Sequence, residues 1–233
     1  SIIKLLLSHD KIDVNAKRRD GETPLHLEVD LFYTSMICMD PIETEETEQG
    51  EQFDDEIDEF AEFLDEIRLA YRRYYCCCCK ATNEYEYELD ELGVVKLLLE
   101  DDKIDVNAKD DDGNTPLHKA VLEKQNWYDE RLELIKLLLS HDKIDVNAKN
   151  NDGNTPLHEA VCYCEIEMAK LFLSHDKIDV NAENNKGKTP LHEAAGRDCK
   201  IEMTKLFLSH DKIDVYAESN EGEYLSDTCK RWY

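Results

Sequence analysis

Residues 143–158 read Lys-Ile-Asp-Val-Asn-Ala-Lys-Asn-Asn-Asp-Gly-Asn-Thr-Pro-Leu-His, and both ends of this stretch recur along the chain. The string Thr-Pro-Leu-His also occurs at 23–26, 115–118 and 189–192, each time two residues after a glycine. The string Lys-Ile-Asp-Val-Asn-Ala also starts at residues 11, 103 and 177, and at 212 with Tyr216 in place of asparagine. Successive histidines of the first string lie 92, 40 and 34 residues apart. The chain is therefore built from a repeat of about 34 residues, with extra residues in two copies.

Each repeat predicts a turn followed by two helices. Thr155 can cap the free amides of a helix start, and Pro156 fits the first turn, where no donor is needed. Apolar residues then follow at helical spacing, both here and in the segment 166–173. Gly153 supplies the positive φ that the preceding polar turn needs. One such helix pair cannot bury its own apolar face, whereas stacked copies can.

These strings resemble the ankyrin repeat, whose hallmark matches residues 153–158 and the three other copies. The resemblance covers residues 1–37 and 89–222. It implies an all-α ankyrin-repeat solenoid of stacked helix-turn-helix units with β-turn fingers. It also implies that the hallmark threonines and histidines hydrogen-bond backbone groups within and between neighbouring turns. Two departures are that no glycine ends the second helix, and that Glu28 stands where the family prefers alanine, which predicts looser packing of the first helix pair.

We expect a single ankyrin-repeat domain over residues 1–233. Its predicted parts are a partial first repeat at 1–13, repeats at about 14–102, 103–142, 143–176 and 177–211, and a degenerate last repeat at 212–233. Because the chain opens with Ser1 inside a hydrophobic pattern, we interpret it as a piece of a longer protein.

An acidic insertion at 39–88 interrupts the first full repeat. Residues 40–92 contain 19 Asp and Glu against 4 Lys and Arg, a net of −15. A heptad seam within the insertion predicts a long amphipathic helix at about 53–79; the seam residues are Phe53, Ile57, Phe60, Leu64, Ile67, Tyr71, Tyr74 and Cys78. This helix could fold back on its own repeats, self-associate as a coiled coil, or bind another protein. The cysteine run 76–79 either continues the helix or, less favoured, accepts lipid.

Charge and cysteine usage limit the function classes. With 28 Lys and Arg against 54 Asp and Glu, the formal charge is −26, which excludes nucleic-acid binding through a general basic surface. No apolar run reaches the roughly 18 residues of a membrane span, and no signal-peptide pattern opens the chain. Nine cysteines, four of them consecutive, form no evenly spaced framework and indicate reduced thiols. We therefore expect a soluble cytoplasmic protein or, were the source an intracellular bacterium, one delivered into a host cell.

Catalytic and metal-binding signals are absent from the sequence. All eight histidines fall at repeat positions, about one layer apart, too far to share a metal ion. Cys162 and Cys164 form only a lone Cys-x-Cys, and no phosphate loop or hydrolase motif occurs. We therefore predict no enzyme activity, no metal and no cofactor. The alternative is that this chain is the recognition fragment of a larger enzyme or secreted effector whose active domain lies outside it.

The predicted function is protein–protein interaction, as a scaffold or regulatory binding module that uses the concave surface of the fingers and first helices. The resemblance implies variable contact positions, which are Lys109, Asp111, Asp112, Asn114, Lys149, Asn151, Asp152, Asn154, Tyr163, Glu183, Asn185, Lys186, Lys188 and Arg197. Trp127 and Tyr128, on a short insertion at 124–129, are candidate anchors, or else pack under the neighbouring helix connection. We expect a protein partner, no nucleic acid, and a monomer, with self-association through the helix at about 53–79 as the alternative.

Overall fold

A computed structural model of the chain describes residues 13–34, 92–122, 128–196, 200–220 and 222. The insertion at 39–88 and its expected helix at about 53–79 lie outside these residues. The chain divides into two compact units, Ser1–Asp105 and Val106–Tyr233, which we call unit 1 and unit 2.

Unit 1 contains one described helix pair, α2 (Pro24–Thr34) and α4 (Gly93–Leu99), preceded by a finger loop. The two helices contact each other through an apolar core. Leu25 and Val29 of α2 are 0% exposed, and Val95 and Leu98 of α4 are 1% exposed. Burial of each such side chain contributes roughly 1.5–3 kcal/mol, which holds the pair together although residues 35–91 separate its helices in sequence.

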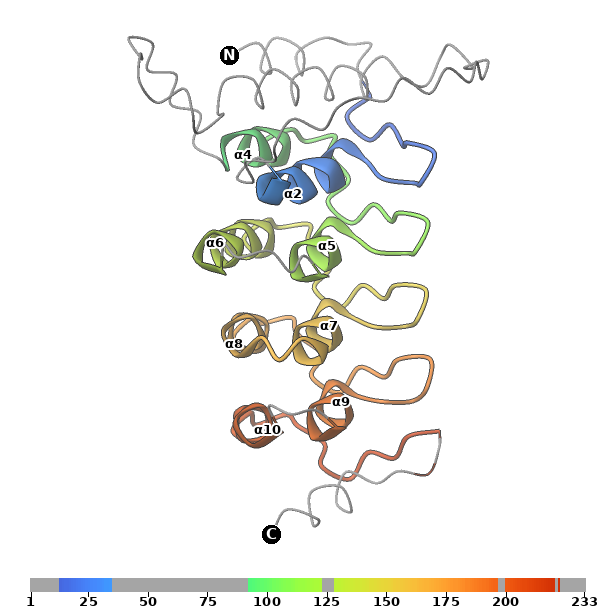
Figure 1. The fold of residues 1–233 in the computed structure, drawn as a ribbon, viewed down its shortest axis with the longest axis vertical. Helices are drawn as coiled ribbons and strands as arrows, with labels where there is room; N and C mark the ends of the chain where they lie inside the picture. Colours follow the sequence, from blue (N-terminus) through green and yellow to red (C-terminus); the bar gives the residue numbers. More distant parts are fainter. Residues whose placement is uncertain (1–12, 35–91, 123–127, 197–199, 221, 223–233) are drawn as a thin grey trace, which may run out of the picture. The chain divides into compact units, whose positions relative to one another are not determined.

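Unit 2 contains three helix pairs in two layers. The first helices are α5 (Pro116–Leu122), α7 (Pro156–Cys162) and α9 (Pro190–Gly196), and the second helices are α6 (Tyr128–Leu139), α8 (Ile166–Leu173) and α10 (Lys200–Leu208). Within each layer every helix contacts the next. Figure 1 shows the finger loops projecting beyond the first helices, on the side away from the second helices.

The core of unit 2 consists of the apolar positions that recur in the repeats. Leu117, Leu157 and Leu191, the leucines of the hallmark string, are all 0% exposed. Phe172 and Phe207 of the second layer are also 0% exposed. No β-strand occurs in the described parts of the chain, where Glu218 forms an isolated bridge. The predicted all-α solenoid of paired helices and fingers is confirmed.

Candidate functional site

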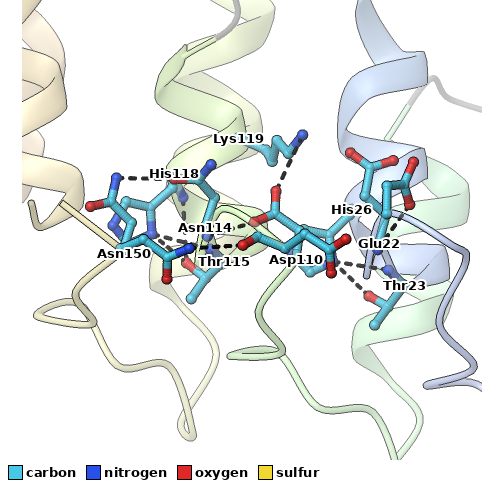
Figure 2. Close-up of polar contacts among 12 residues, drawn as sticks. Glu22, Thr23, His26, Asp110, Asn114, Thr115, His118, Lys119 and Asn150 are labelled. Atoms are coloured by element: carbon cyan, nitrogen blue, oxygen red, sulfur yellow. Dashed lines mark hydrogen bonds and ion pairs between the residues drawn. The ribbon is translucent and has the colours of Figure 1, made fainter. Parts of the chain in front are cut away.

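The hallmark threonine and histidine form a reciprocal pair at each helix start. In α7 the Thr155 hydroxyl lies 2.9 Å from His158 Nδ1, and the Thr155 backbone N–H donates to the same nitrogen at 3.2 Å. The pairs Thr23–His26 and Thr115–His118 repeat this geometry, as Figure 2 shows for each. The pair closes the first turn, where backbone amides have no partner inside the helix.

The same histidines connect neighbouring repeats. His118 Nε2 lies 3.0 Å from the Asn154 carbonyl oxygen, and His158 Nε2 lies 3.0 Å from the Lys188 carbonyl oxygen. A backbone N–H can only donate and a carbonyl can only accept, so Nδ1 is unprotonated and Nε2 carries the hydrogen. Burial lowers the pKa of His158 to about 4, which keeps the ring neutral. The predicted structural role of these histidines is confirmed.

One asparagine in each finger forms hydrogen bonds with the backbone of the following repeat. The Asn147 side-chain amide donates to the Lys177 carbonyl at 2.8 Å, and its oxygen accepts the Asp179 N–H at 2.8 Å. We call Asn15, Asn107, Asn147 and Asn181 the asparagine ladder, because each makes this pair of bonds, Asn15 within unit 1 and the others within unit 2.

A second set of asparagines stacks the finger tips of unit 2. The backbone N–H groups of Asn151, Asn185 and Asn220 donate to the carbonyls of Asp112, Asp152 and Lys186. Their side-chain amides donate to the preceding tips as well, at 2.8 Å for Asn151 and Asn185 and 3.4 Å for Asn220. We call these three residues the tip ladder. They hold successive tips in one register.

Two lysines also bond to the next finger. Lys109 Nζ donates to the Lys149 carbonyl at 2.7 Å, and Lys149 Nζ donates to the Glu183 carbonyl at 2.6 Å. At the base of the fingers, the Asn150 amide donates to Asn114 Oδ1 at 3.1 Å (Figure 2). The Asn154 amide donates to Glu159 Oε1 of its own repeat at 2.9 Å, and Asn154 Oδ1 accepts the Asn184 amide of the next finger at 3.0 Å. These side chains therefore stabilise the stack of fingers.

The predicted contact residues accordingly fall into three groups. One group bonds within the finger stack through its side chains, namely Lys109, Asn114, Lys149, Asn151, Asn154 and Asn185. A second group presents exposed side chains, namely Asp111, Asp112, Asp152, Glu183, Lys186 and Tyr163, while Lys188 is half-buried. Trp127, Arg197 and the side chain of Tyr128 lie outside the described part of the structure.

Sequence reasoning missed the asparagine ladder and a buried ion pair. Asn107, Asn147 and Asn181 occur at the same place in each repeat, and this recurrence was the available signal. Arg131 is 3% exposed, and its guanidinium lies 3.0 Å from Glu165 Oε1 and 3.2 Å from Met168 Sδ. No periodic pattern marks this arginine, because only one repeat contains it.

The cysteines differ from expectation in one respect. The Cys162 thiol lies 3.9 Å from Glu193 Oε2 and is not in a disulfide, whereas Cys164 is disulfide-bonded, so the prediction of reduced thiols is wrong for Cys164. Spacing along the sequence was the wrong criterion, since a disulfide requires proximity in space. Cys164 also ends α7 with φ of 61°, its N–H donating to the Val161 carbonyl while the Glu165 N–H donates to the Ala160 carbonyl. This is a Schellman cap with cysteine where glycine is usual.

Several carboxyl groups occupy low-exposure positions on the first helices and fingers, among them Asp110 and Glu28. Asp110 is 8% exposed and forms an ion pair with Lys119 at 3.4 Å (Figure 2). Glu28 of α2 is half-buried, and desolvation raises the pKa of its carboxyl to about 7. Among the described residues, no group of three or more His, Cys, Asp or Glu side chains is placed to hold a metal ion. Over the same residues, the helices are too short or too polar to cross a membrane.

Comparison with known proteins identifies the family. A family model of ankyrin repeats, in three copies, matches residues 77–150 and 127–221. The chain belongs to the ankyrin-repeat family. The crystal structure of EF0377, an ankyrin repeat protein, is similar with a TM-score of 0.60 and 18% identity, over 98% of this chain and 83% of that one. No curated protein matches.

The resemblance to ankyrin repeats is therefore confirmed. Ankyrin repeats are generally protein–protein interaction modules, and the fold is typically non-catalytic. In this ankyrin chain, the polar side chains that recur from repeat to repeat stabilise the stack. The exposed tip residues, which change from repeat to repeat, are the remaining candidates for recognition.

Proposed function

We propose that unit 2 binds a partner protein through its finger tips and the adjoining ends of the first helices. The observation that carries this proposal is the tip ladder. Asp112, Asp152 and Lys186 occupy equivalent tip positions, because the carbonyl of each accepts the N–H of the next tip's asparagine. All three side chains are exposed, and none has a role in the ladder. The backbone is thus fixed while the presented side chains vary.

A fixed backbone favours binding, because ordering loops at an interface costs free energy. The tip ladder, the asparagine ladder and the two lysine bonds order the fingers of unit 2 before any partner arrives. Partner recognition then depends on side chains alone.

The charges of the finger tips indicate the charge pattern of a complementary partner surface. Asp111 and Asp112 form an acidic tip, Asp152 adds one acid on the next, and Lys186 places a base on the one after. A complementary partner carries basic groups opposite the first two tips and an acidic group opposite the third. Tyr163, 37% exposed at the end of α7, adds an aromatic contact. The proposal involves binding alone and includes no catalytic step.

The test is affinity capture from lysate of the source organism with three immobilised chains. These are the native chain, a tip variant (Asp112→Ser, Asp152→Ser, Lys186→Ser) and a control variant (Asp142→Ser, Asp176→Ser, Lys212→Ser). The control changes exposed residues of the turns that follow the second helices. We expect proteins captured by the native chain and the control to be lost from the tip variant. Equal capture by the tip variant would place recognition elsewhere.

A further inference from the structure

Glu159 occupies a position on the first helices where the repeats carry different charges. It directly follows the hallmark histidine of α7, and the equivalent residues are Lys119 of α5 and Glu193 of α9. In the α5 repeat the charge is neutralised within the chain, because Lys119 Nζ lies 3.4 Å from Asp110 Oδ2 (Figure 2). The α7 repeat has Asn150 in the place of Asp110, so Glu159 meets a neutral amide there.

Two amides at the base of the finger hold the Glu159 carboxylate in one orientation. Asn154 Nδ2 donates to Glu159 Oε1 at 2.9 Å, and Asn150 Nδ2 donates to the same oxygen at 3.3 Å. Within the described part of the chain, the second oxygen, Oε2, accepts no hydrogen bond, and no Lys, Arg or His forms an ion pair with this carboxylate. Solvent reaches Oε2, since no glutamate oxygen of the described residues is both fully buried and without a hydrogen-bond partner.

Glu159 thus carries a charge at 8% exposure that no ion pair among the described residues neutralises. Burying a carboxylate is costly unless a cation accompanies it. The location of Glu159 in the first turn of α7 offsets part of this cost through the helix dipole. Glutamine would brace the finger equally well, because its Oε1 accepts the same two bonds. The negative charge is therefore available for a ligand.

An aromatic ring and a second carboxylate lie close to Glu159 on the first helices. Tyr163 follows Glu159 by four residues, which places both on one face of α7, and it is 37% exposed. Cys162, one residue before Tyr163, has its Sγ 3.9 Å from Glu193 Oε2 of α9. This combination of an oriented carboxylate and an exposed ring suits a planar cation.

We propose that Glu159 Oε2 binds an arginine side chain of the partner protein, with the guanidinium packed against Tyr163. The inference rests on the function proposed above, and it names one residue type that the partner contributes. A guanidinium donates N–H groups to a carboxylate while its flat face packs on an aromatic ring. A lysine ammonium is more strongly hydrated and suits a position this buried less well. The exposed Asp112 and Asp152 of the finger tips attract the same basic partner.

Random peptides displayed on phage, selected against the immobilised 233-residue chain, test this inference. We expect the enriched peptides to share an arginine. Replacing that arginine by lysine or by citrulline, its neutral isostere, should weaken binding, by roughly tenfold or more for citrulline.

Variants of the chain separate the Glu159 charge from the general acidity of the protein. Glu159→Gln should weaken binding of the enriched peptides by roughly tenfold or more. Its melting temperature should stay close to that of the native chain, because the two asparagine bonds are kept. Glu202→Gln, which removes the same charge from an exposed position of α10, is the matched control and should bind like the native chain.

Four results would overturn the inference. These are peptides that bind Glu159→Gln as tightly as the native chain, peptides whose affinity is unchanged by citrulline, a selection that enriches no peptide, and a marked fall in the melting temperature of Glu159→Gln, which would assign the charge to the finger base. The proposed function is judged separately, because the tip variant keeps Glu159. Loss of capture by the tip variant, together with unchanged binding by Glu159→Gln, would retain the finger tips and reject the arginine site.

Discussion

Gly153 lies at a finger tip where the backbone has φ of +77° and the next repeat is in close contact. A Cβ added there would lie 2.5 Å from Asn185 Oδ1 and 2.6 Å from the Asn185 backbone nitrogen. The side chain could rotate away, but the backbone nitrogen could not. Gly222 has nearly the same φ, +73°, and no described atom within 4 Å of the same position. The two glycines therefore separate the cost of backbone strain from the cost of disturbing the tip ladder.

The magnitudes follow from these contacts. An alanine in the left-handed region costs roughly 1–2 kcal/mol, which is the whole cost expected for Gly222→Ala. Gly153→Ala would also displace Asn185, which donates to Asp152 O at 3.1 Å and to Asn151 O at 2.8 Å. Each lost bond costs about 0.5–1.5 kcal/mol. The free energy of unfolding should therefore fall by about 2–5 kcal/mol for Gly153→Ala.

Urea unfolding followed by circular dichroism measures both variants. We expect Gly153→Ala to have the lower transition midpoint, and its melting temperature to fall by roughly 2–4 °C per kcal/mol of lost stability. Equal losses for the two variants would refute the reasoning, because they would show that Asn185 does not pack against this tip.

Four further changes have expected outcomes. Asn147→Ala should cost about 1–3 kcal/mol in urea unfolding, and Asn147→Asp, which keeps the acceptor, about half of that; equal costs would contradict the acceptor's role. Glu28 has a folded pKa of about 7, above its unfolded value of 4.5, so its burial weakens unit 1 as the pH rises from 4.5 to 7. Glu28→Gln should therefore have a higher melting temperature than the native chain at pH 8 and nearly the same one at pH 4. A gain that is the same at both pH values would contradict this. His158 has a folded pKa of about 4, below 6.5, so it contributes stability above pH 6.5 that is lost as pH falls through 4; an NMR titration midpoint near 6.5 would contradict its burial. In reducing buffer, Cys164→Gly should raise the free energy of unfolding by about 1 kcal/mol and Cys164→Ala should not, because only glycine relieves the strain of the positive φ at this residue. Equal melting temperatures for the two variants would contradict this.

The sequence was sufficient to predict the fold and the hallmark bonds. Thr-Pro-Leu-His and its glycine recur at fixed spacing, and a local motif that caps a helix behaves alike in every copy. The destinations of long polar side chains could not be predicted in this way. Lys109 and Lys149 are charged finger residues in the sequence, yet each bonds to a carbonyl one repeat away. That outcome depends on how closely the fingers stack, which no single repeat encodes.

The disulfide bond of Cys164 and the raised pKa of the Glu28 carboxyl could not be predicted from the sequence for the same reason. Both depend on which groups other segments bring near, and neither follows from spacing along the chain. The sequence marked Glu28 as a departure from the family pattern, but it did not predict the raised pKa of the carboxyl.

The placement of the ladders makes this protein suitable for domain insertion. Asn15 bonds to the Lys103 carbonyl and the Asp105 N–H across 88 and 90 residues of sequence, whereas Asn107 makes the equivalent bonds across 36 and 38. The additional residues lie between α2 and α4 in the sequence, and a shorter addition at 124–129 overlaps the start of α6. Both additions interrupt the sequence of a repeat near the connection of its two helices, and the inter-finger bonds are unchanged. A sensor or a foreign binding domain grafted at the equivalent connection of α7 and α8 should therefore leave the finger surface in register.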